Sequence, residues 1–140
     1  MSDEFTSRWW TIELASGWSA KSEESCSSIT AEVGVGALQI SAYGCTGGPV
    51  TEGTCMSLLK GEYPAGVEVL NHNFGQFSGL NVSFSVEKVY WRKWSLRNGS
   101  LLLFVTYNCD TEEKDIERSA VDQMLATLKP IPLYEQQRRP

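Results

Sequence analysis

The chain has 140 residues, of which 41% are hydrophobic, and it carries 17 acidic against 12 basic side chains. This length and apolar content favour one domain with its own core, which excludes a disordered chain and a disulfide-dense miniprotein. The formal charge of -5 argues against sequence-independent binding of DNA or RNA, because such binding requires several phosphates to be neutralised.

No stretch of the sequence is apolar enough to cross a bilayer. The longest aliphatic and aromatic run is Leu101–Val105, whereas a membrane helix needs roughly 20 residues. The acidic start, Met1–Glu4, lacks the apolar segment of a secretory signal. We therefore expect a cytoplasmic protein with no membrane partner.

The cysteines do not follow a metal-binding pattern. No Cys-x-x-Cys pair is present, and His72 is the single histidine that could complete a site. We therefore predict no metal ion and no cofactor. We expect reduced, mostly buried thiols at Cys26, Cys45, Cys55 and Cys109.

The first half of the chain contains short regular elements separated by loops. Alternation of apolar and polar residues predicts strands at Trp10–Leu14 and Leu38–Ala42, and another extended stretch is expected from Trp18, while the Ser- and Glu-rich residues 20–32 have no clear period. A short helix is expected over Thr51–Lys60, with Thr51 as its N-cap. Glycine and proline predict loops at 44–49 and at 61–73, after which the chain is again strand-like from Phe74 to Gly79.

The strongest local signal is the segment 82–108, in which two β-rich runs flank Asn98-Gly99. This dipeptide favours a two-residue type I′ turn, so the segment is predicted to form a long antiparallel hairpin. With these two residues in the turn, one face is mainly apolar and should face the core. It pairs Leu96 with Leu101, Trp94 with Leu103, Arg92 with Val105, and Tyr90 with Tyr107.

Arg92 is the charged exception on this apolar face. An unpaired guanidinium among apolar side chains would cost several kcal/mol. We therefore predict that Arg92 either reaches the edge of the sheet or pairs with a carboxylate.

The other face of the predicted hairpin mixes aromatic and basic side chains. We expect that the C-terminal helix cannot cover this face, which leaves its side chains available to a partner. Trp and Arg are enriched at the energetic centres of protein interfaces. The residues predicted to bind a protein partner are Trp91, Lys93, Arg97 and Phe104.

A C-terminal amphipathic helix is predicted over Thr111–Lys129. Asp110 and Glu113 offer a capping box, and Pro130 ends the helix. The domain is expected to span 1–130, followed by a polar tail at 131–140. The apolar stripe that should rest on the hairpin consists of Ile116, Ala120, Val121, Met124, Leu125 and Leu128.

Three stretches together resemble the PsbP-like family. They are Trp10–Leu14 followed by Gly17-Trp18, the run Trp94–Tyr107, and the terminal helix with Val121 and Leu125. The resemblance implies an α+β fold, an α/β/α sandwich in which a long central hairpin carries the C-terminal helix on one face and a short helix lies elsewhere. It also implies a binding or adaptor role, and it transfers no individual functional residue.

No motif in the sequence predicts catalysis. The patterns G-x-S-x-G, P-loop and H-E-x-x-H are all absent, so we predict no catalytic residue. We expect a non-enzymatic protein that binds another protein, of which an immunity protein or a chaperone for secreted effectors is the most concrete version. The alternative is a small-molecule binder or weak enzyme, with a pocket between loops 44–49 and 61–73. That pocket would be lined by Tyr43, Cys45, His72 and Asn73.

Overall fold

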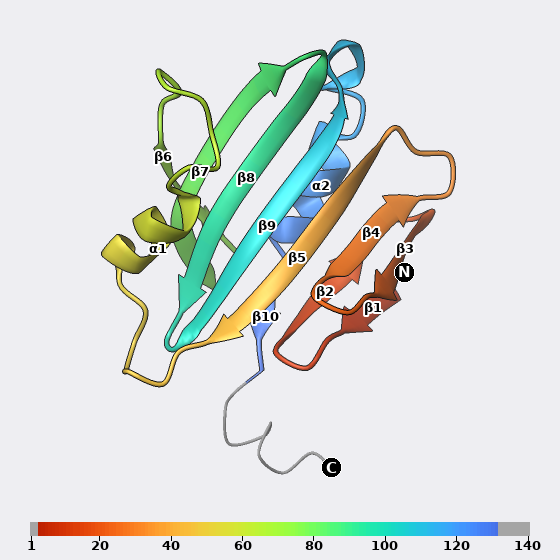
Figure 1. Cartoon of the computed structure of the whole chain (residues 1–140). Coiled ribbons are helices and arrows are strands. Elements are labelled where there is room, and N and C mark those ends of the chain that lie inside the picture. Colours follow the sequence, from red (N-terminus) through yellow and green to blue (C-terminus); the bar gives the residue numbers. More distant parts are fainter. Residues whose placement is uncertain (1–2, 132–140) are drawn as a thin grey trace.

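Antiparallel strands form most of the structure, a computed structural model in which residues 3–131 are described. Seven strands form one sheet in the order β3-β4-β5-β9-β8-β7-β6, and three form a smaller sheet in the order β1-β2-β10 (Figure 1). The large sheet consists of β3 (Trp18–Ser22), β4 (Ser27–Ala31), β5 (Gly36–Gly44), β6 (Leu70–Phe74), β7 (Phe77–Val86), β8 (Val89–Asn98) and β9 (Leu101–Asp110). The small sheet consists of β1 (Asp3–Thr6), β2 (Trp10–Leu14) and β10 (Lys129–Pro130), and the α-helices are α1 (Glu52–Leu59) and α2 (Arg118–Leu125).

The clearest local patterns in the first half of the chain form the expected elements. Alternation in β2 buries Trp10, Ile12 and Leu14 and leaves Glu13 exposed, as a strand covered on one face requires. α1 begins after Thr51 because the side chain of this residue accepts a hydrogen bond from the Thr54 N–H at 3.2 Å. The predicted strand at Leu38–Ala42 is confirmed as part of β5.

Strands β1, β4 and β6 lie where no regular element was predicted, whereas β3 begins at Trp18, where an extended stretch was expected. β4 occupies part of the Ser- and Glu-rich stretch, and β6 occupies the end of the predicted loop 61–73. β3 and β6 are the two edges of the large sheet, so most of their side chains meet solvent and carry no strong apolar pattern. The sequence of β4 likewise has a weak apolar pattern, because this strand buries only Ser27 and Ile29.

The long hairpin is present, but its turn lies one residue later than predicted. Asn98 pairs with Leu101, so the turn residues are Gly99 and Ser100. A type I′ turn needs two residues with positive φ, whereas only Gly99 of this pair has one, at +56°. Each β8 residue therefore pairs with a β9 residue two positions later in the sequence than predicted; Leu96, for example, pairs with Leu103 instead of Leu101. A shift of two keeps every side chain on its predicted face, because side chains alternate with a period of two.

The C-terminal helix is much shorter than the predicted Thr111–Lys129. A single 3-10 turn forms first, without the predicted cap from the Asp110 side chain, and α2 begins only at Arg118. Just before α2, the buried Glu117 carboxylate accepts hydrogen bonds from the Tyr107 hydroxyl at 2.8 Å and the Val35 N–H at 3.2 Å. These contacts with β9 and the chain before β5 fix the segment outside a helix, and Ile116 is left exposed.

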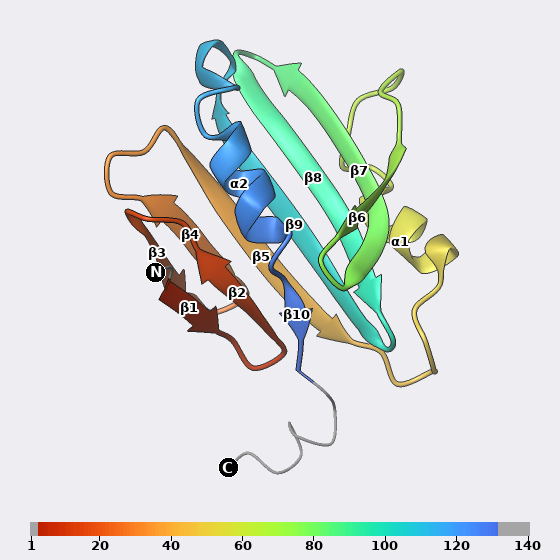
Figure 2. The same ribbon diagram turned by 180° about the vertical axis from the view of Figure 1, so that it is seen from behind.

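The two sides of the large sheet are covered differently. α2 and the small sheet lie on one side, and α1 lies on the other (Figures 1 and 2). The predicted α/β/α sandwich is therefore wrong, because a second antiparallel sheet forms much of the layer beside α2, which is only eight residues long. The fold is mainly β rather than α+β.

The main core lies between the large sheet and the layer that contains α2. It confirms that the C-terminal helix rests on the apolar face of the hairpin, since residues of α2 share this core with β8 and β9. Its fully buried members include Trp10, Trp94, Leu103, Val121 and Leu125. A smaller core under α1 contains Cys55, Leu59, Leu80, Val82 and Leu102. Of the predicted tail at 131–140, only Ile131 is among the described residues.

Candidate partner-binding surface

The four residues predicted to bind a partner lie on the α1 side of the large sheet. Trp91, Lys93 and Arg97 alternate along β8, and Phe104 comes from β9, directly opposite Ser95. All four predicted residues are half-buried. The structure therefore brings them onto one face.

Lys93 lies within an aromatic cluster on this face. Its ammonium is 4.9 Å from the centroid of the Trp91 ring and 5.6 Å from that of the Phe84 ring. A cation is attracted to the π electrons of such rings. The Nζ atom also pairs with Glu62 Oε1 at 3.1 Å, and the side chain of Glu62 is 42% exposed. The ion pair therefore stands at the rim of the cluster, in contact with solvent.

Phe84 belongs to this cluster, although it was not among the residues predicted to bind a partner. It lies on β7 directly opposite Trp91 and is half-buried. The alternation of Leu80, Val82 and Phe84 along β7 places these side chains on one face, but that face is assigned only once the pairing of β7 with β8 is known. We define the aromatic surface as Phe84, Trp91, Lys93 and Phe104.

Arg97 belongs to a different part of the same side of the sheet. Its Nη1 donates a hydrogen bond to the Val50 carbonyl at 3.3 Å, just before α1. α1 covers the same strand two residues away, where the buried Ser95 hydroxyl donates to the Cys55 carbonyl at 2.9 Å. The predicted surface is therefore divided. α1 lies over the end near Arg97, whereas on this side of the sheet no described helix lies over the end of β8 that carries Trp91 (Figure 1).

The residues of the alternative pocket do not come together. Tyr43 is exposed near the end of β5 and Cys45 follows that strand, whereas His72 and Asn73 lie on β6, at one edge of the sheet. Adjacent residues of a strand point to opposite faces, so His72 faces the α2 side and Asn73 faces the α1 side. Asn73 lines a surface pocket that includes none of the other three residues.

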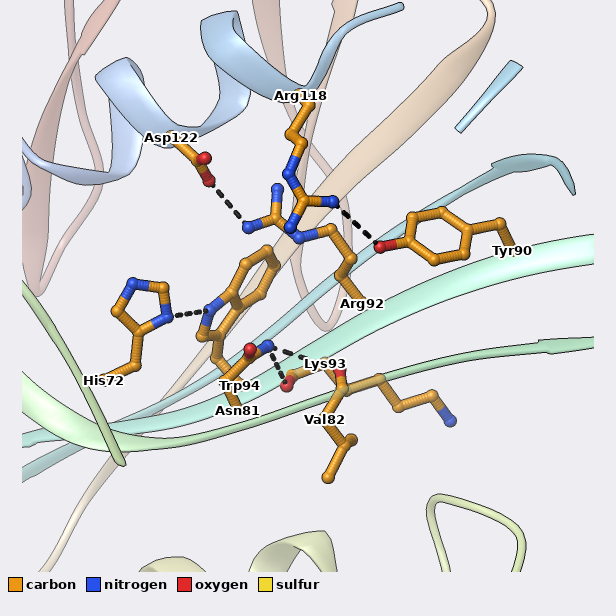
Figure 3. A network of polar contacts seen from close by, with 9 residues as sticks. All are labelled: His72, Asn81, Val82, Tyr90, Arg92, Lys93, Trp94, Arg118 and Asp122. Carbon is orange, nitrogen blue, oxygen red and sulfur yellow. Dashed lines mark hydrogen bonds and ion pairs between the residues drawn. The ribbon is translucent and has the colours of Figure 1, made fainter. Parts of the chain in front are cut away.

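His72 instead takes part in polar contacts on the α2 side of the sheet (Figure 3). The Trp94 Nε1–H donates to His72 Nδ1 at 3.3 Å, which requires this nitrogen to be unprotonated. Burial and, after it, the Arg92 guanidinium lower the pKa of His72, while Asp122 acts in the opposite direction. The imidazole therefore supports Trp94 as a neutral acceptor.

Arg92 confirms the prediction that it pairs with a carboxylate. The side chain is buried, and its Nη2 donates to Asp122 Oδ1 at 2.7 Å (Figure 3). The guanidinium also lies 4.6 Å from the centroid of the Trp94 ring. The partner of Arg92 comes from α2, so the pair joins the helix to the centre of the sheet.

The described residues hold free thiols and no metal cluster. The four cysteines are free, and burial raises the pKa of Cys55 and of Cys109, which keeps these thiols protonated at neutral pH. In residues 3–131, no group of three or more His, Cys, Asp or Glu side chains is arranged to hold a metal ion. Nor does this part of the chain contain a helix that is both long and apolar enough to span a membrane.

Comparisons with known proteins identify a shared fold. No family model matches the chain, and no curated protein matches it. The chain is similar to a protein from Bacteroides thetaiotaomicron VPI-5482 whose crystal structure was solved at 1.50 Å, with a TM-score of 0.67 and 16% sequence identity. The match covers 95% of this chain and 50% of that protein, so this chain spans about half its length. At this identity the likeness concerns the fold alone, and the PsbP-like resemblance stays a prediction.

Proposed function

We propose that this chain is a non-enzymatic protein that binds another protein through the aromatic surface. The observation that carries the proposal is the gathering of Phe84, Trp91 and Lys93 on a part of the sheet whose α1 side no described helix covers, with Phe104 on the same side next to α1. Partly exposed aromatic rings gain free energy when a partner removes them from water. Aromatic side chains of this kind carry much of the binding energy in protein interfaces.

The chemistry of the surface specifies what the partner presents. Trp91 and Phe84 stand opposite each other on neighbouring strands and offer apolar ring surface. Between them, the Lys93 ammonium has three hydrogens and forms one ion pair, with Glu62. We infer that the partner places an apolar side chain on the rings and a carboxylate beside Lys93. This charge pattern, with the acidic balance of the chain, favours a protein partner over a nucleic acid.

An immunity protein and a chaperone of a secreted effector are the two concrete forms of this proposal. Each works by binding one protein through a preformed surface, and neither needs a reactive group. A cytoplasmic location is part of the same proposal.

The test is affinity purification from the source organism, with quantitative mass spectrometry of what co-purifies. Three tagged variants are compared with the wild-type chain: Trp91→Ala, Lys93→Glu and Ile116→Ala. Ile116 is an exposed apolar residue in the segment before α2, so Ile116→Ala is the matched control. Far-ultraviolet circular dichroism and a thermal melt of each variant verify that it is folded.

We expect a stoichiometric partner with wild-type protein and with Ile116→Ala. Its affinity should fall about tenfold or more with Trp91→Ala and with Lys93→Glu, as for a central interface residue. Equal recovery with all variants would place the partner elsewhere on the molecule and overturn the proposal. A self-associated chain whose dimer is lost in Trp91→Ala would show that a second copy, rather than another protein, covers the surface.

A further inference from the structure

A polar pocket lies on the α1 side of the sheet, near the end of β8 opposite to Trp91. Its volume is about 310 Å³, and its lining consists of Glu52, Asn71, Asn73, Ser78, Gly79 and Arg97. All of these residues are polar except Gly79. The pocket is separate from the aromatic surface, with which it shares no residue.

The strand register explains why these side chains meet. Asn73 of β6 is paired with Ser78 of β7, and Ser78 is paired with Arg97 of β8. Directly paired residues point to the same face of a sheet, so the three side chains form one row across three strands. Asn71 lies two positions from Asn73 on the same face. Glu52 is the first residue of α1 and reaches the pocket from above this row.

The hydrogen-bonding groups around the pocket are largely unused by the protein. Within residues 3–131, the side chains of Glu52, Asn71, Asn73 and Ser78 form no hydrogen bond or ion pair with one another or with other residues. Arg97 uses Nη1 for the Val50 carbonyl, while its Nε is buried without a partner in the described structure. One cation, one anion, two amides and a hydroxyl therefore line a single pocket, and most of their hydrogen-bonding groups have no partner among the described residues.

The two charged groups are the informative part of this lining. Glu52 and Arg97 have opposite charge and line the same pocket, yet they do not form an ion pair with each other. A ligand that carries both charges satisfies both groups, because its carboxylate can bind the guanidinium while its ammonium binds Glu52. Asn71, Asn73 and Ser78 then supply neutral hydrogen bonds. A volume of about 310 Å³ lies at the small end of ligand pockets.

We propose that this pocket binds a free α-amino acid as its zwitterion. The carboxylate of the ligand lies at Arg97, its ammonium lies at Glu52, and the row of Asn73 and Ser78 contacts the remaining polar atoms. This binding is separate from the partner-binding function, because neither requires the residues of the other.

The experiment is a titration of the ¹⁵N-labelled chain with each of the twenty free L-amino acids, followed by nuclear magnetic resonance. The side-chain amide signals of Asn71 and Asn73 report directly from the pocket. The tightest binder is then compared with its N-acetyl derivative, its carboxamide and D-glucose. Variants Glu52→Gln and Asn73→Ala are matched with Glu32→Gln, which makes the same charge change at an exposed residue outside the pocket, and with Trp91→Ala.

We expect at least one free amino acid to shift both amide signals with saturation. Affinity should fall tenfold or more in Glu52→Gln and Asn73→Ala, and for both blocked derivatives, and it should be unchanged in Glu32→Gln and Trp91→Ala. The proposal is overturned if no amino acid shifts these signals, or if the blocked forms or D-glucose bind as well as the free amino acid. Unchanged affinity in Glu52→Gln would likewise overturn it. Loss of amino-acid binding in Trp91→Ala would contradict the separation of the two sites.

Discussion

Arg92 and Lys93 are neighbours on β8, yet they point to opposite sides of the large sheet and meet different surroundings (Figure 3). Each pairs with one carboxylate, Arg92 with Asp122 at 2.7 Å and Lys93 with Glu62 at 3.1 Å. The side chain of Arg92 is only 3% exposed, and its Nε and Nη1 have no partner among the described residues. The Lys93 side chain is 13% exposed and lies beside two aromatic rings at the surface.

The contrast separates the face of the hairpin that holds the fold from the face that we propose binds a partner. On the α2 side, side chains of β8 and β9 are sealed beneath a helix and a second sheet, so packing and charge neutralisation there must hold the fold. On the α1 side, beyond the end of α1, aromatic and basic side chains remain within reach of solvent. Changes on the first face should therefore affect folding, and changes on the second should mainly affect binding.

The largest expected difference in the free energy of unfolding is between variants of two adjacent residues of β9. Leu103 is fully buried on the α2 side, whereas Phe104 is half-buried on the α1 side. Leu103→Ala should lower the free energy of unfolding by about 3–4 kcal/mol, because it removes apolar contacts and leaves a cavity. Phe104→Ala should lower it by about 1 kcal/mol, since part of this ring is already in water. Urea denaturation of both variants measures the difference, and equal losses would show that the two faces contribute alike.

A smaller difference is expected between the two ion pairs. Asp122→Ala leaves the Arg92 guanidinium buried without a counter-charge and should cost about 2–3 kcal/mol. The loss stays below that of a fully buried pair because the Asp122 side chain is 41% exposed and water can enter in its place. Glu62→Ala is the matched control and should cost less than about 1 kcal/mol, as for a pair at the surface.

A double variant tests whether the stability lost in Asp122→Ala comes from the unpaired charge of Arg92. Replacing both members of the buried pair, with Arg92→Met and Asp122→Leu, should recover much of the stability lost in Asp122→Ala, because no uncompensated charge remains. If the double variant is no more stable than Asp122→Ala, the loss comes from packing of α2 rather than from the orphaned guanidinium.

Patterns that depend on near neighbours were predictable from the sequence. The alternation in β2, the Thr51 cap of α1 and the faces of the long hairpin all follow from a period or from one side chain bonding the local backbone. The extent of α2 was not predictable in this way. Its start depends on the contacts of Glu117 with Tyr107 and Val35, which are far away in the sequence.

The candidate site was predictable to a similar degree. Trp91, Lys93 and Phe104 were placed on one face by alternation and by the predicted turn at Asn98-Gly99, and the structure places them on one face. Phe84 joins them only through the pairing of β7 with β8, which no local pattern encodes. The polar pocket was hidden for the same reason. Its row of Asn73, Ser78 and Arg97 crosses three strands, and β6 was predicted to be a loop because its polar side chains conceal an edge strand.

The smallest expected effect concerns pH and again distinguishes the α2 side. His72 accepts the Trp94 hydrogen bond when neutral, and burial followed by Arg92 lowers the pKa of His72 below that of an exposed imidazole. Between these two pKa values the unfolded chain binds more protons than the folded one, so the contribution of His72 to stability is fully present above about pH 6.5. This contribution should be lost as pH falls through the folded-state pKa.

The chain has one histidine, so a slope in the free energy of unfolding between about pH 5.5 and 6.5 is assigned to this residue. Urea denaturation at several pH values should show a small decrease toward acid in the wild-type chain. His72→Gln keeps an acceptor for Trp94 but cannot titrate, and it should flatten the curve. A slope that persists in His72→Gln would mean that the imidazole is solvated in the folded state, and that this edge of the α2 side is as open as the aromatic surface.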